Sequence, residues 1–383
     1  MFKPKVLAVF GTRPEAIKMA PLIKELEKHR QKIDTVVAVT AQHREMLDQV
    51  LNLFQISPQY DLNIMQRKQS LYDITTRVLL GMKEILEKER PNLVLVHGDT
   101  STTFVAALAA FYQRIPVGHV EAGLRTRNKY SPYPEEMNRR LAGVLADLHF
   151  APTLRAKENL LSENVPPETI LVTGNTVIDA LLATVKENYS FRGELASIDF
   201  TSSKLLLVTA HRRENWGEPM TRILLALKDL VLKFPEVEVI FPVHRNPRVR
   251  EPAREILGNM ARVHLIEPLD YEPFVNLMNK VYLVLTDSGG LQEEAPSLGK
   301  PVLVLRDTTE RPEALEAGTV KLVGTQRERI ISETVRLLQD QDAYQKMANA
   351  VNPYGDGKAS RRIVEGILYH FKLSPYPPVQ FSS

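Results

Sequence analysis

The sequence predicts an α/β protein made of two Rossmann-like domains, each built on a parallel sheet, which face each other across a cleft. Apolar runs without polar alternation recur along all 383 residues and are separated by amphipathic segments. Such runs are typical of parallel strands that are buried on both faces, and strand–helix alternation is typical of parallel sheets with right-handed crossovers. The pattern stops once and restarts, and the chain is long enough for two domains with separate cores.

The predicted elements follow in order along both halves. In the first half the strands are residues 6–10, 35–39, 93–96, 116–120 and 170–172, with helices that include 14–29 and 71–89. In the second half the strands are residues 204–209, 237–242, 263–266, 281–285 and 301–305, with a helix at 271–280. A polar stretch at 187–203 is interpreted as part of the connection. We therefore place the first domain at 1–172 and the second at 173–359.

The composition excludes several classes of function. The formal charge of +3 is nearly balanced and no run of Lys or Arg forms a basic tract, so neither nucleic acid nor a membrane is expected as a partner. No stretch reaches the length of a membrane span, and the apolar start is too short for a signal peptide. The chain has no cysteine, which excludes disulfides, thiol nucleophiles and Cys-ligated zinc and suits a cytoplasmic enzyme.

The segment 286–301 carries the most specific functional signal. It connects two apolar runs and has room only for a tight turn and a short helix, which Ser288 can cap. Gly289 and Gly290 let a ligand approach the backbone closely, and N–H groups at a helix start suit a diphosphate. Glu294 follows one to two turns later, where a carboxylate could accept both hydroxyls of a ribose. The segment therefore predicts a site for a nucleoside diphosphate.

Polar residues also gather where the other strands end, as expected for Rossmann-like sheets. The first strand leads into a glycine turn with Arg13 and Lys18, two cations suited to phosphate. Carboxylates mark the other strand ends and loops of the first half, namely Asp99, Glu121, Glu135 and Glu136. Histidines and arginines mark those of the second half, among them His211, Arg212 and His244. This division suggests an acidic half-site and a phosphate-binding half-site.

Several of these residues also have a structural interpretation. Glu135 or Glu136, taken alone, would be interpreted as a capping residue at the start of a helix. His97 and His119 are interpreted as hydrogen-bonded structural residues. Asp340-Gln341-Asp342 resembles a metal-binding DxD sequence but is predicted to lie on a solvated helical surface. With no HExxH sequence and no close His–carboxylate pair, no metal site is predicted.

Six motifs are spread over nearly the whole chain, and their occurrence in this order is highly specific for one protein family. They are Gly11-Thr12-Arg13-Pro14-Glu15, His97-Gly98-Asp99-Thr100, His119-Val120-Glu121-Ala122-Gly123-Leu124-Arg125-Thr126, Asp287-Ser288-Gly289-Gly290, Arg306-Asp307-Thr308-Thr309-Glu310-Arg311-Pro312-Glu313 and Asn352-Pro353-Tyr354-Gly355-Asp356-Gly357. Together they resemble the non-hydrolysing UDP-N-acetylglucosamine (UDP-GlcNAc) 2-epimerases of bacteria. The resemblance implies the glycosyltransferase type B fold, with residues 360–383 packing back on the first domain. It also implies a cytoplasmic homodimer that needs no cofactor and no metal.

The same resemblance implies a reaction and a set of roles. The family interconverts UDP-GlcNAc and UDP-N-acetylmannosamine (UDP-ManNAc) for cell-surface polysaccharide, by eliminating UDP to 2-acetamidoglucal and adding it back. This chemistry needs acid and base groups on both faces of C2 and stabilisation of the leaving diphosphate. By matching position, the catalytic residues are Asp99, Glu121, Glu135 and His211, and the substrate-binding residues are Arg13, Lys18, Phe274, Ser288, Gly289, Gly290, Glu294 and Arg311. Which carboxylate serves which face, and whether His211 donates a proton or only positive charge, stays open.

A regulatory site is a further implication of the resemblance. Some bacterial relatives hold a second UDP-GlcNAc molecule beside the active site, and the matching positions here are Gln42, Glu45, Lys68, Glu136, Arg212 and His244. Some relatives carry glutamine at the place of Glu45 and arginine at the place of Lys68. Because a carboxylate repels phosphate and lysine lacks arginine's two-pronged contact, we expect a weaker or differently shaped second site.

Three alternative functions share most of these features. A glycosyltransferase of the same architecture would bind the same donor, a hydrolysing epimerase would release free ManNAc, and a catalytically silent protein would only sense the nucleotide sugar. The three carboxylates Asp99, Glu121 and Glu135 favour epimerisation.

Overall fold

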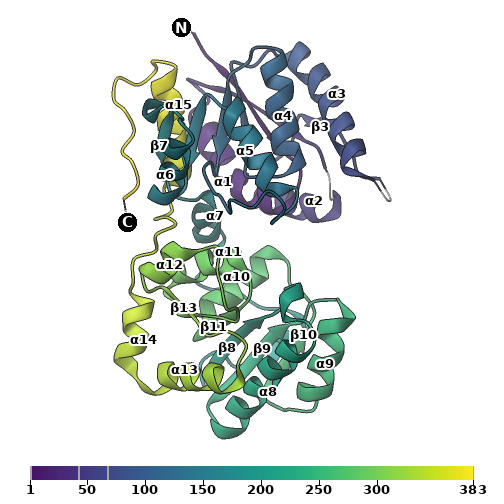
Figure 1. Ribbon diagram of the computed structural model, residues 1–383, viewed down its shortest axis with the longest axis vertical. Helices are drawn as coiled ribbons and strands as arrows, with labels where there is room; N and C mark the ends of the chain where they lie inside the picture. The colour runs from purple at the N-terminus through teal and green to yellow at the C-terminus, as the bar shows by residue number, and fades with distance from the viewer. Residues whose placement is uncertain (1, 42–43, 67–68, 383) are drawn as a thin grey trace. The chain divides into compact units, whose positions relative to one another are not determined.

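The chain divides into two compact units in the computed structural model, which describes residues 2–41, 44–66 and 69–382 (Figure 1). The first unit contains residues 1–183 and 354–383, and the second contains residues 184–353. The first unit thus runs past the expected limit at 172, and its returning segment begins before the expected residue 360. The difference arises because the loop before the last helix is tied to the first unit: the Asn175 N–H donates to the Tyr354 carbonyl at 2.6 Å.

The first unit is a seven-stranded, entirely parallel sheet in the order β3-β2-β1-β4-β5-β6-β7. Its strands are β1 (Lys5–Phe10), β2 (Asp34–Val39), β3 (Tyr60–Asp61), β4 (Leu93–His97), β5 (Val117–Val120), β6 (Leu148–Ala151) and β7 (Ile170–Val172). Its helices are α1 (Arg13–Lys28), α2 (Arg44–Leu53), α3 (Leu71–Glu89), α4 (Ser101–Tyr112), α5 (Glu135–Leu145), α6 (Leu154–Ser162), α7 (Thr176–Thr184) and α15 (Ala359–His370).

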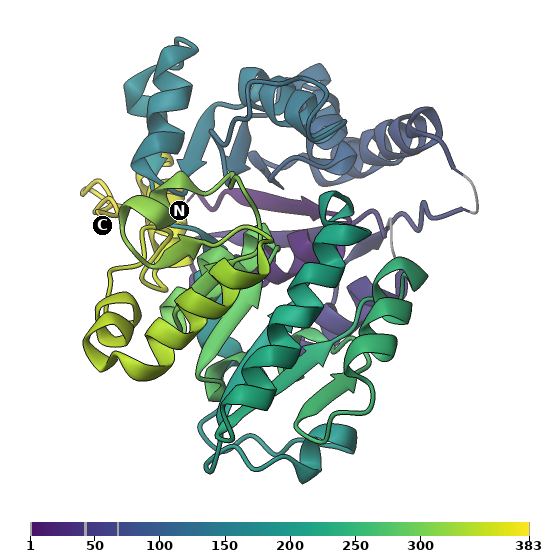
Figure 2. The same cartoon turned by 60° about the horizontal axis from the view of Figure 1, so that its bottom comes forward.

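The second unit is a six-stranded parallel sheet in the order β10-β9-β8-β11-β12-β13. Its strands are β8 (Lys204–Thr209), β9 (Val237–Pro242), β10 (Val263–Ile266), β11 (Leu283–Thr286), β12 (Val302–Val304) and β13 (Val320–Leu322). Its helices are α8 (Glu218–Lys233), α9 (Pro247–Leu257), α10 (Tyr271–Lys280), α11 (Gly289–Glu294), α12 (Pro312–Glu316), α13 (Arg327–Gln339) and α14 (Gln341–Ala348). Figure 2 shows helices of this unit lying against its sheet.

Both sheets confirm the prediction of two parallel-sheet α/β domains. In each sheet the strand order reverses at one point, between β1 and β4 in the first unit and between β8 and β11 in the second. Open α/β sheets bind ligands outside the carboxyl ends of the strands at such a reversal. The two places to look for function are therefore the loops after β1 and β4 and the loops after β8 and β11.

The end of the chain completes the first unit. Helix α15 packs on α1 and buries Ile363, Val364, Ile367 and Leu368, and farther along the Phe381 N–H donates to the Val172 carbonyl at 2.8 Å. In the second unit, Asp340 accepts the Ala343 N–H at 2.9 Å as the exposed N-cap of α14. The DxD sequence thus lies at the start of a surface helix, as predicted. Within the described residues, no helix is long and apolar enough to cross a membrane.

Candidate active site

Glu121 is the centre of the acidic half-site in the first unit. It follows β5 directly, and its Oε2 atom forms an ion pair with Lys18 of α1 and accepts the Asn175 Nδ2–H at 2.8 Å. Only 9% of the Glu121 side chain is exposed. The sequence-predicted Glu121 and Lys18 are therefore brought together, and the two charges hold each other in place.

The backbone at Glu121 is in the left-handed region, with a φ of 63°. A non-glycine residue there costs on the order of 1–3 kcal/mol, and such residues cluster at functional sites. Across from it, Gly98 has a φ of 68°, and a Cβ atom at Gly98 would lie 3.5 Å from Glu121 Oε1. The positive φ, rather than lack of space, therefore favours glycine in the turn after β4.

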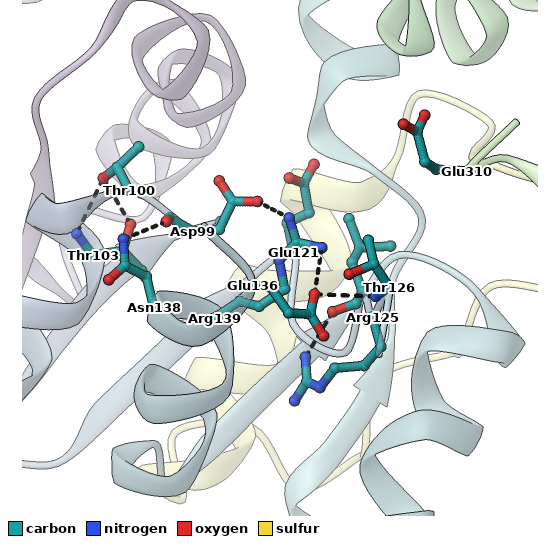
Figure 3. Close-up of polar contacts among 12 residues, drawn as sticks. Asp99, Thr100, Thr103, Glu121, Arg125, Thr126, Glu136, Asn138, Arg139 and Glu310 are labelled. Carbon is teal, nitrogen blue, oxygen red and sulfur yellow. Dashed lines mark hydrogen bonds and ion pairs between the residues drawn. The ribbon is translucent and has the colours of Figure 1, made fainter. Parts of the chain in front are cut away.

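Asp99 lies next to Gly98 and forms an ion pair with Arg139 of α5 (Figure 3). The Asn138 Nδ2–H donates to the Asp99 carbonyl at 3.0 Å, so one helix holds both the backbone and the side chain of Asp99. Burial raises the pKa of Asp99, the positive charge of Arg139 opposes this, and the negative charge of Glu121 raises it further. Asp99 and Glu121 are thus electrostatically coupled carboxylates, an arrangement suited to acid–base chemistry.

Glu135 and Glu136 begin α5 but differ in environment. Glu136 is fully buried, and its two oxygens accept the Thr126 and Arg127 N–H groups at 3.0 and 3.1 Å. It also lies 3.4 Å from Arg139 (Figure 3). Glu135 is partly exposed, and its side chain makes no hydrogen bond or ion pair with any residue that the structure describes. Glu136 therefore holds the loop after β5, whereas Glu135 is available to a ligand.

Glu15 belongs to this half-site but was missed as a functional candidate. Its buried carboxylate accepts the Gly11 and Thr12 N–H groups at 3.1 and 2.8 Å and the Thr100 hydroxyl at 2.8 Å. It thus ties the turn after β1, which carries Arg13, to the turn after β4. The sequence did contain a signal, because Thr12 and Glu15 have the spacing of a helix capping box.

The two histidines that were interpreted as structural differ. The His119 Nε2 atom lies 2.8 Å from the Gly98 carbonyl, so the interpretation of His119 is confirmed. His97 is buried, but neither of its ring nitrogens has a hydrogen-bond partner among the described residues. Its Nε2 atom lies 3.9 Å from Glu121 Oε2. For His97 the prediction of a hydrogen-bonded residue was wrong, because the ring faces the Glu121–Lys18 pair.

Burial of His97 should make stability depend on pH. Burial lowers the His97 pKa from 6.5 to about 4, with Glu121 opposing and Lys18 reinforcing the shift. A lowered histidine pKa favours folding above pH 6.5, and this contribution is lost as the pH falls towards about 4. Between these limits wild type should lose up to about 3 kcal/mol of unfolding free energy relative to His97→Gln. Denaturant titrations across this range measure it, and parallel curves for the two proteins would contradict the assignment.

The glycine turn of the second unit follows β11 and begins α11. Ser288 is the N-cap residue, but its side chain makes no capping hydrogen bond, and its N–H donates to Thr286 Oγ1 at 2.9 Å. The expected capping by Ser288 is therefore absent, and its N–H is used within the loop. The Gly289 and Gly290 N–H groups lie in the first helical turn, where no preceding turn supplies acceptors. A Cβ atom at Gly290 would lie 3.4 Å from Glu294 Oε1, so a side chain there would crowd the carboxylate.

Glu294 and Arg311 border this turn with partners of their own. The hydroxyl of half-buried Tyr271 donates to Glu294 Oε2 at 3.4 Å, and Phe274, also half-buried, lies one turn farther along α10. Arg311 forms an ion pair with the buried Glu293, one residue before Glu294. The structure thus gathers Glu294, the glycines and Arg311 around α11, with Glu293 as a supporting carboxylate that sequence reasoning did not single out.

His211 follows β8 and lies beside two residues from neighbouring strand ends. Its Nδ1 atom is 3.3 Å from Oδ1 of the fully buried Asp287, which follows β11. Its ring stacks on that of His244, which follows β9, with ring centroids 5.6 Å apart and planes 17° apart. Burial lowers the His211 pKa, Asp287 opposes this, and His244 and Arg212 lower it further. Asp287 was not predicted as a site residue, although it precedes the predicted turn.

Arg212 belongs to a charged network over the glycine turn. The Glu310 carboxylate accepts hydrogen bonds from both terminal nitrogens of Arg306, at 2.9 and 3.2 Å. One of its oxygens also lies 3.8 Å from the Arg212 guanidinium. Burial alone would raise the pKa of Glu310. The positive charges of Arg306 and Arg212 outweigh this effect and hold the pKa at about 2. A Cβ atom at Gly289 would lie 3.7 Å from the Arg212 guanidinium and 3.8 Å from the Glu310 carboxylate. A negatively charged group therefore already lies at this turn between two arginines.

The remaining regulatory candidates are less defined. Gln42 and Lys68 lie outside the described residues, and Glu45 is exposed in the first turn of α2. Across the described parts of the chain, no group of three or more His, Asp or Glu side chains is arranged to hold a metal ion.

Comparison with known proteins assigns the chain to one family. The sequence model for UDP-N-acetylglucosamine 2-epimerase matches residues 24–368. The UDP-N-acetylglucosamine 2-epimerase of Bacillus subtilis is 58% identical over the full length of both chains. The crystal structure of the Neisseria meningitidis enzyme bound to UDP-GlcNAc is 56% identical, covers 95% of this chain and all of that one, and has a TM-score of 0.84. A glycotransferase of kitacinnamycin, 13% identical with a TM-score of 0.66 over 98% of this chain and all of that one, shares the fold alone. The chain therefore belongs to the UDP-N-acetylglucosamine 2-epimerase family.

Proposed function

We propose that this protein interconverts UDP-GlcNAc and UDP-ManNAc by inverting the configuration at C2 of the sugar. The observation that carries the proposal is the coupled pair of carboxylates Asp99 and Glu121 at adjacent strand ends. Glu135, which has no partner among the described residues, begins α5 in the same unit. The family membership and the relative bound to UDP-GlcNAc support the same substrate. A transferase or a nucleotide-sugar sensor would not need carboxylates on two faces of C2.

The mechanism we propose is elimination followed by re-addition. The C2 hydrogen is not acidic, so direct deprotonation is implausible. A carboxylate instead takes the C2 proton as the C1–O bond breaks, which gives 2-acetamidoglucal and UDP. A carboxylic acid then delivers a proton to the opposite face of C2 while UDP adds back at C1. Asp99, Glu121 and Glu135 supply these proton transfers.

The second half of the mechanism is stabilisation of the departing diphosphate. We assign this to Arg13, His211 and the N–H groups of the glycine turn, since positive charge and helix N-terminal amides favour an anion that forms during the reaction. Lys18 keeps Glu121 in place, which follows from their ion pair. Phe274, Glu294 and Arg311 complete the proposed UDP site.

The decisive experiment is incubation with UDP-GlcNAc alone in deuterated water, followed by NMR. We expect UDP-ManNAc with deuterium at C2. Free ManNAc and UDP would identify a hydrolysing enzyme, and no product would favour a sensor or a transferase that lacks its acceptor. Turnover that retains the original C2 hydrogen would exclude elimination.

Glu294 provides a separate test of the nucleotide site. Glu294→Ala should weaken UDP binding by about 1–3 kcal/mol, because the ribose hydroxyls would lose their acceptor. Calorimetry with UDP measures the change. Glu316→Ala is the matched control, since this carboxylate ends the short helix α12 in the same unit. Unchanged UDP affinity in Glu294→Ala would remove Glu294 from the site.

Three further features belong to the proposal. A second UDP-GlcNAc molecule binds through residues that include Arg212 and His244, the protein acts as a cytoplasmic homodimer, and its product supplies cell-surface polysaccharide. Their basis is the resemblance of the motifs, and the regulatory part is tested through the kinetics described in the Discussion.

A further inference from the structure

Asp287 is a buried carboxylate whose two oxygens have different environments. Its Oδ2 atom accepts the His211 N–H at 2.8 Å, the Arg212 N–H at 2.8 Å and the Asn215 Nδ2–H at 3.0 Å. These bonds fix the loop after β8 to the end of β11. One oxygen alone therefore accounts for the structural role of Asp287.

The other oxygen points to a role in the chemistry. Asp287 Oδ1 is buried and has no hydrogen-bond partner among the described residues, while the Nδ1 atom of His211 lies 3.3 Å from it. A buried oxygen without a donor is destabilising, and more so when the group is charged. If His211 Nδ1 carries a proton, a small rotation of the ring lets it donate to Asp287 Oδ1, and this hydrogen bond removes the cost.

We infer that Asp287 is a positioning residue for His211, holding a proton on Nδ1 so that Nε2 is the nitrogen presented to the diphosphate. The inference rests on the proposed function, which assigns His211 to the departing UDP. The His211 side chain is 41% exposed, so a ligand can reach the ring. When the diphosphate binds, the ring takes up a proton on Nε2; this imidazolium then donates from Nδ1 to Asp287 and from Nε2 to the phosphate oxygen.

The charges around His211 define what Asp287 contributes. His244 stacks on the ring, and Arg212 lies on the same loop; both disfavour a second proton on His211. Asp287 is the negative group that faces the ring and offsets them. A carboxylate that fixes the tautomer of a histidine and stabilises its charged form is the arrangement found in hydrolytic triads.

Asp287→Asn tests the inference because the side chain keeps its shape. The amide oxygen can still accept the three bonds of Oδ2, whereas the amide N–H₂ group faces His211 Nδ1 and requires that nitrogen to be an acceptor. The ring should therefore change from the Nδ1–H tautomer in wild type to the Nε2–H tautomer in the variant. Long-range ¹⁵N–¹H NMR of histidine, assigned with His211→Gln and recorded well above pH 6.5, distinguishes the two forms.

The kinetic expectation is a loss in kcat with little change in KM. Without a charged ring, kcat for UDP-GlcNAc should fall about 10²- to 10⁴-fold, and the limb of the pH–rate profile that reports His211 should disappear. The matched control is Glu238→Gln, because Glu238 lies 2.9 Å from the His264 ring in the same unit. That variant should change the His264 tautomer and leave kcat unaltered.

Each result separates this inference from the proposed function. An Nε2–H tautomer of His211 in wild type would overturn the inference without any variant, even if Asp287→Asn failed to fold. A folded Asp287→Asn protein with lost kcat but an unchanged tautomer and pH profile would show a purely structural role. Absence of epimerase activity in wild type would overturn the proposed function, whereas the tautomer would still report whether Asp287 positions His211.

Discussion

Glu121→Gln should lower kcat by about 10²- to 10⁴-fold while UDP binds with nearly unchanged affinity. Glutamine can still accept the Asn175 bond, but it can neither take nor deliver the C2 proton. Glu121 lies at the end of β5 in the first unit, whereas the proposed UDP site belongs to the second. Proton transfer should therefore be lost without loss of nucleotide binding. Steady-state kinetics with UDP-GlcNAc and calorimetry with UDP measure the two effects separately.

The matched control for Glu121→Gln is Glu89→Gln. Glu89 also pairs with a lysine, Lys5 at 2.8 Å, but Lys5 begins β1, at the opposite end of the strands from the half-site. Glu89→Gln should keep kcat. Full activity in Glu121→Gln, or equal losses in both variants, would contradict a role for Glu121 in proton transfer. The same comparison applied to Asp99→Asn and Glu135→Gln separates the three carboxylates.

A second large effect is expected in regulation. Pure UDP-ManNAc should turn over poorly, and traces of UDP-GlcNAc should accelerate it by about 5- to 150-fold, the range typical of allosteric coupling. Arg212→Ala and His244→Ala should abolish the acceleration. Arg212 lies over the glycine turn beside Glu310, and His244 stacks on His211, so both can transmit the presence of a second ligand to His211.

Arg213→Ala is the control for this experiment. It is adjacent to Arg212, but its guanidinium lies 6.0 Å over the Trp216 ring, so the acceleration should persist. Initial rates at varied UDP-ManNAc, with and without added UDP-GlcNAc, give the comparison. Hyperbolic kinetics with pure UDP-ManNAc and no response to UDP-GlcNAc would show that the protein lacks a regulatory site.

The long, regular elements of the fold could be predicted from the sequence. The strands at 204–209, 237–242 and 263–266 and the helix at 71–89 have the expected bounds, because continuous apolar runs and amphipathic periodicity are local signals. Strands β3, β6 and β13 were not predicted. They contain two to four residues each, and pairing within the sheet creates them. The polar stretch at 187–203 lies within the second unit rather than between domains.

The strand-end rule led to both proposed half-sites, but it could not supply the contacts within them. Lys18 and Glu121 are 103 positions apart in sequence, and His211 and Asp287 are 76 apart; only the folded sheets bring them together. Glu15, Asp287 and Glu293 were overlooked because a buried supporting carboxylate looks like any other acid in a linear sequence. Their partners are backbone N–H groups and side chains from distant loops.

The return of α15 to the first unit has a consequence for how the protein is made. The second unit is encoded in one uninterrupted segment, 184–353, whereas the first needs residues 354–383 to cover α1. During synthesis on the ribosome the second unit can therefore fold first, because the first unit is completed only when α15 has been made. This is the reverse of the usual order, in which the N-terminal domain folds first. Chains that stop before α15 would leave the apolar side of α1 open to other partially made chains and to proteases. Protection of the apolar side of α1 thus depends on α15.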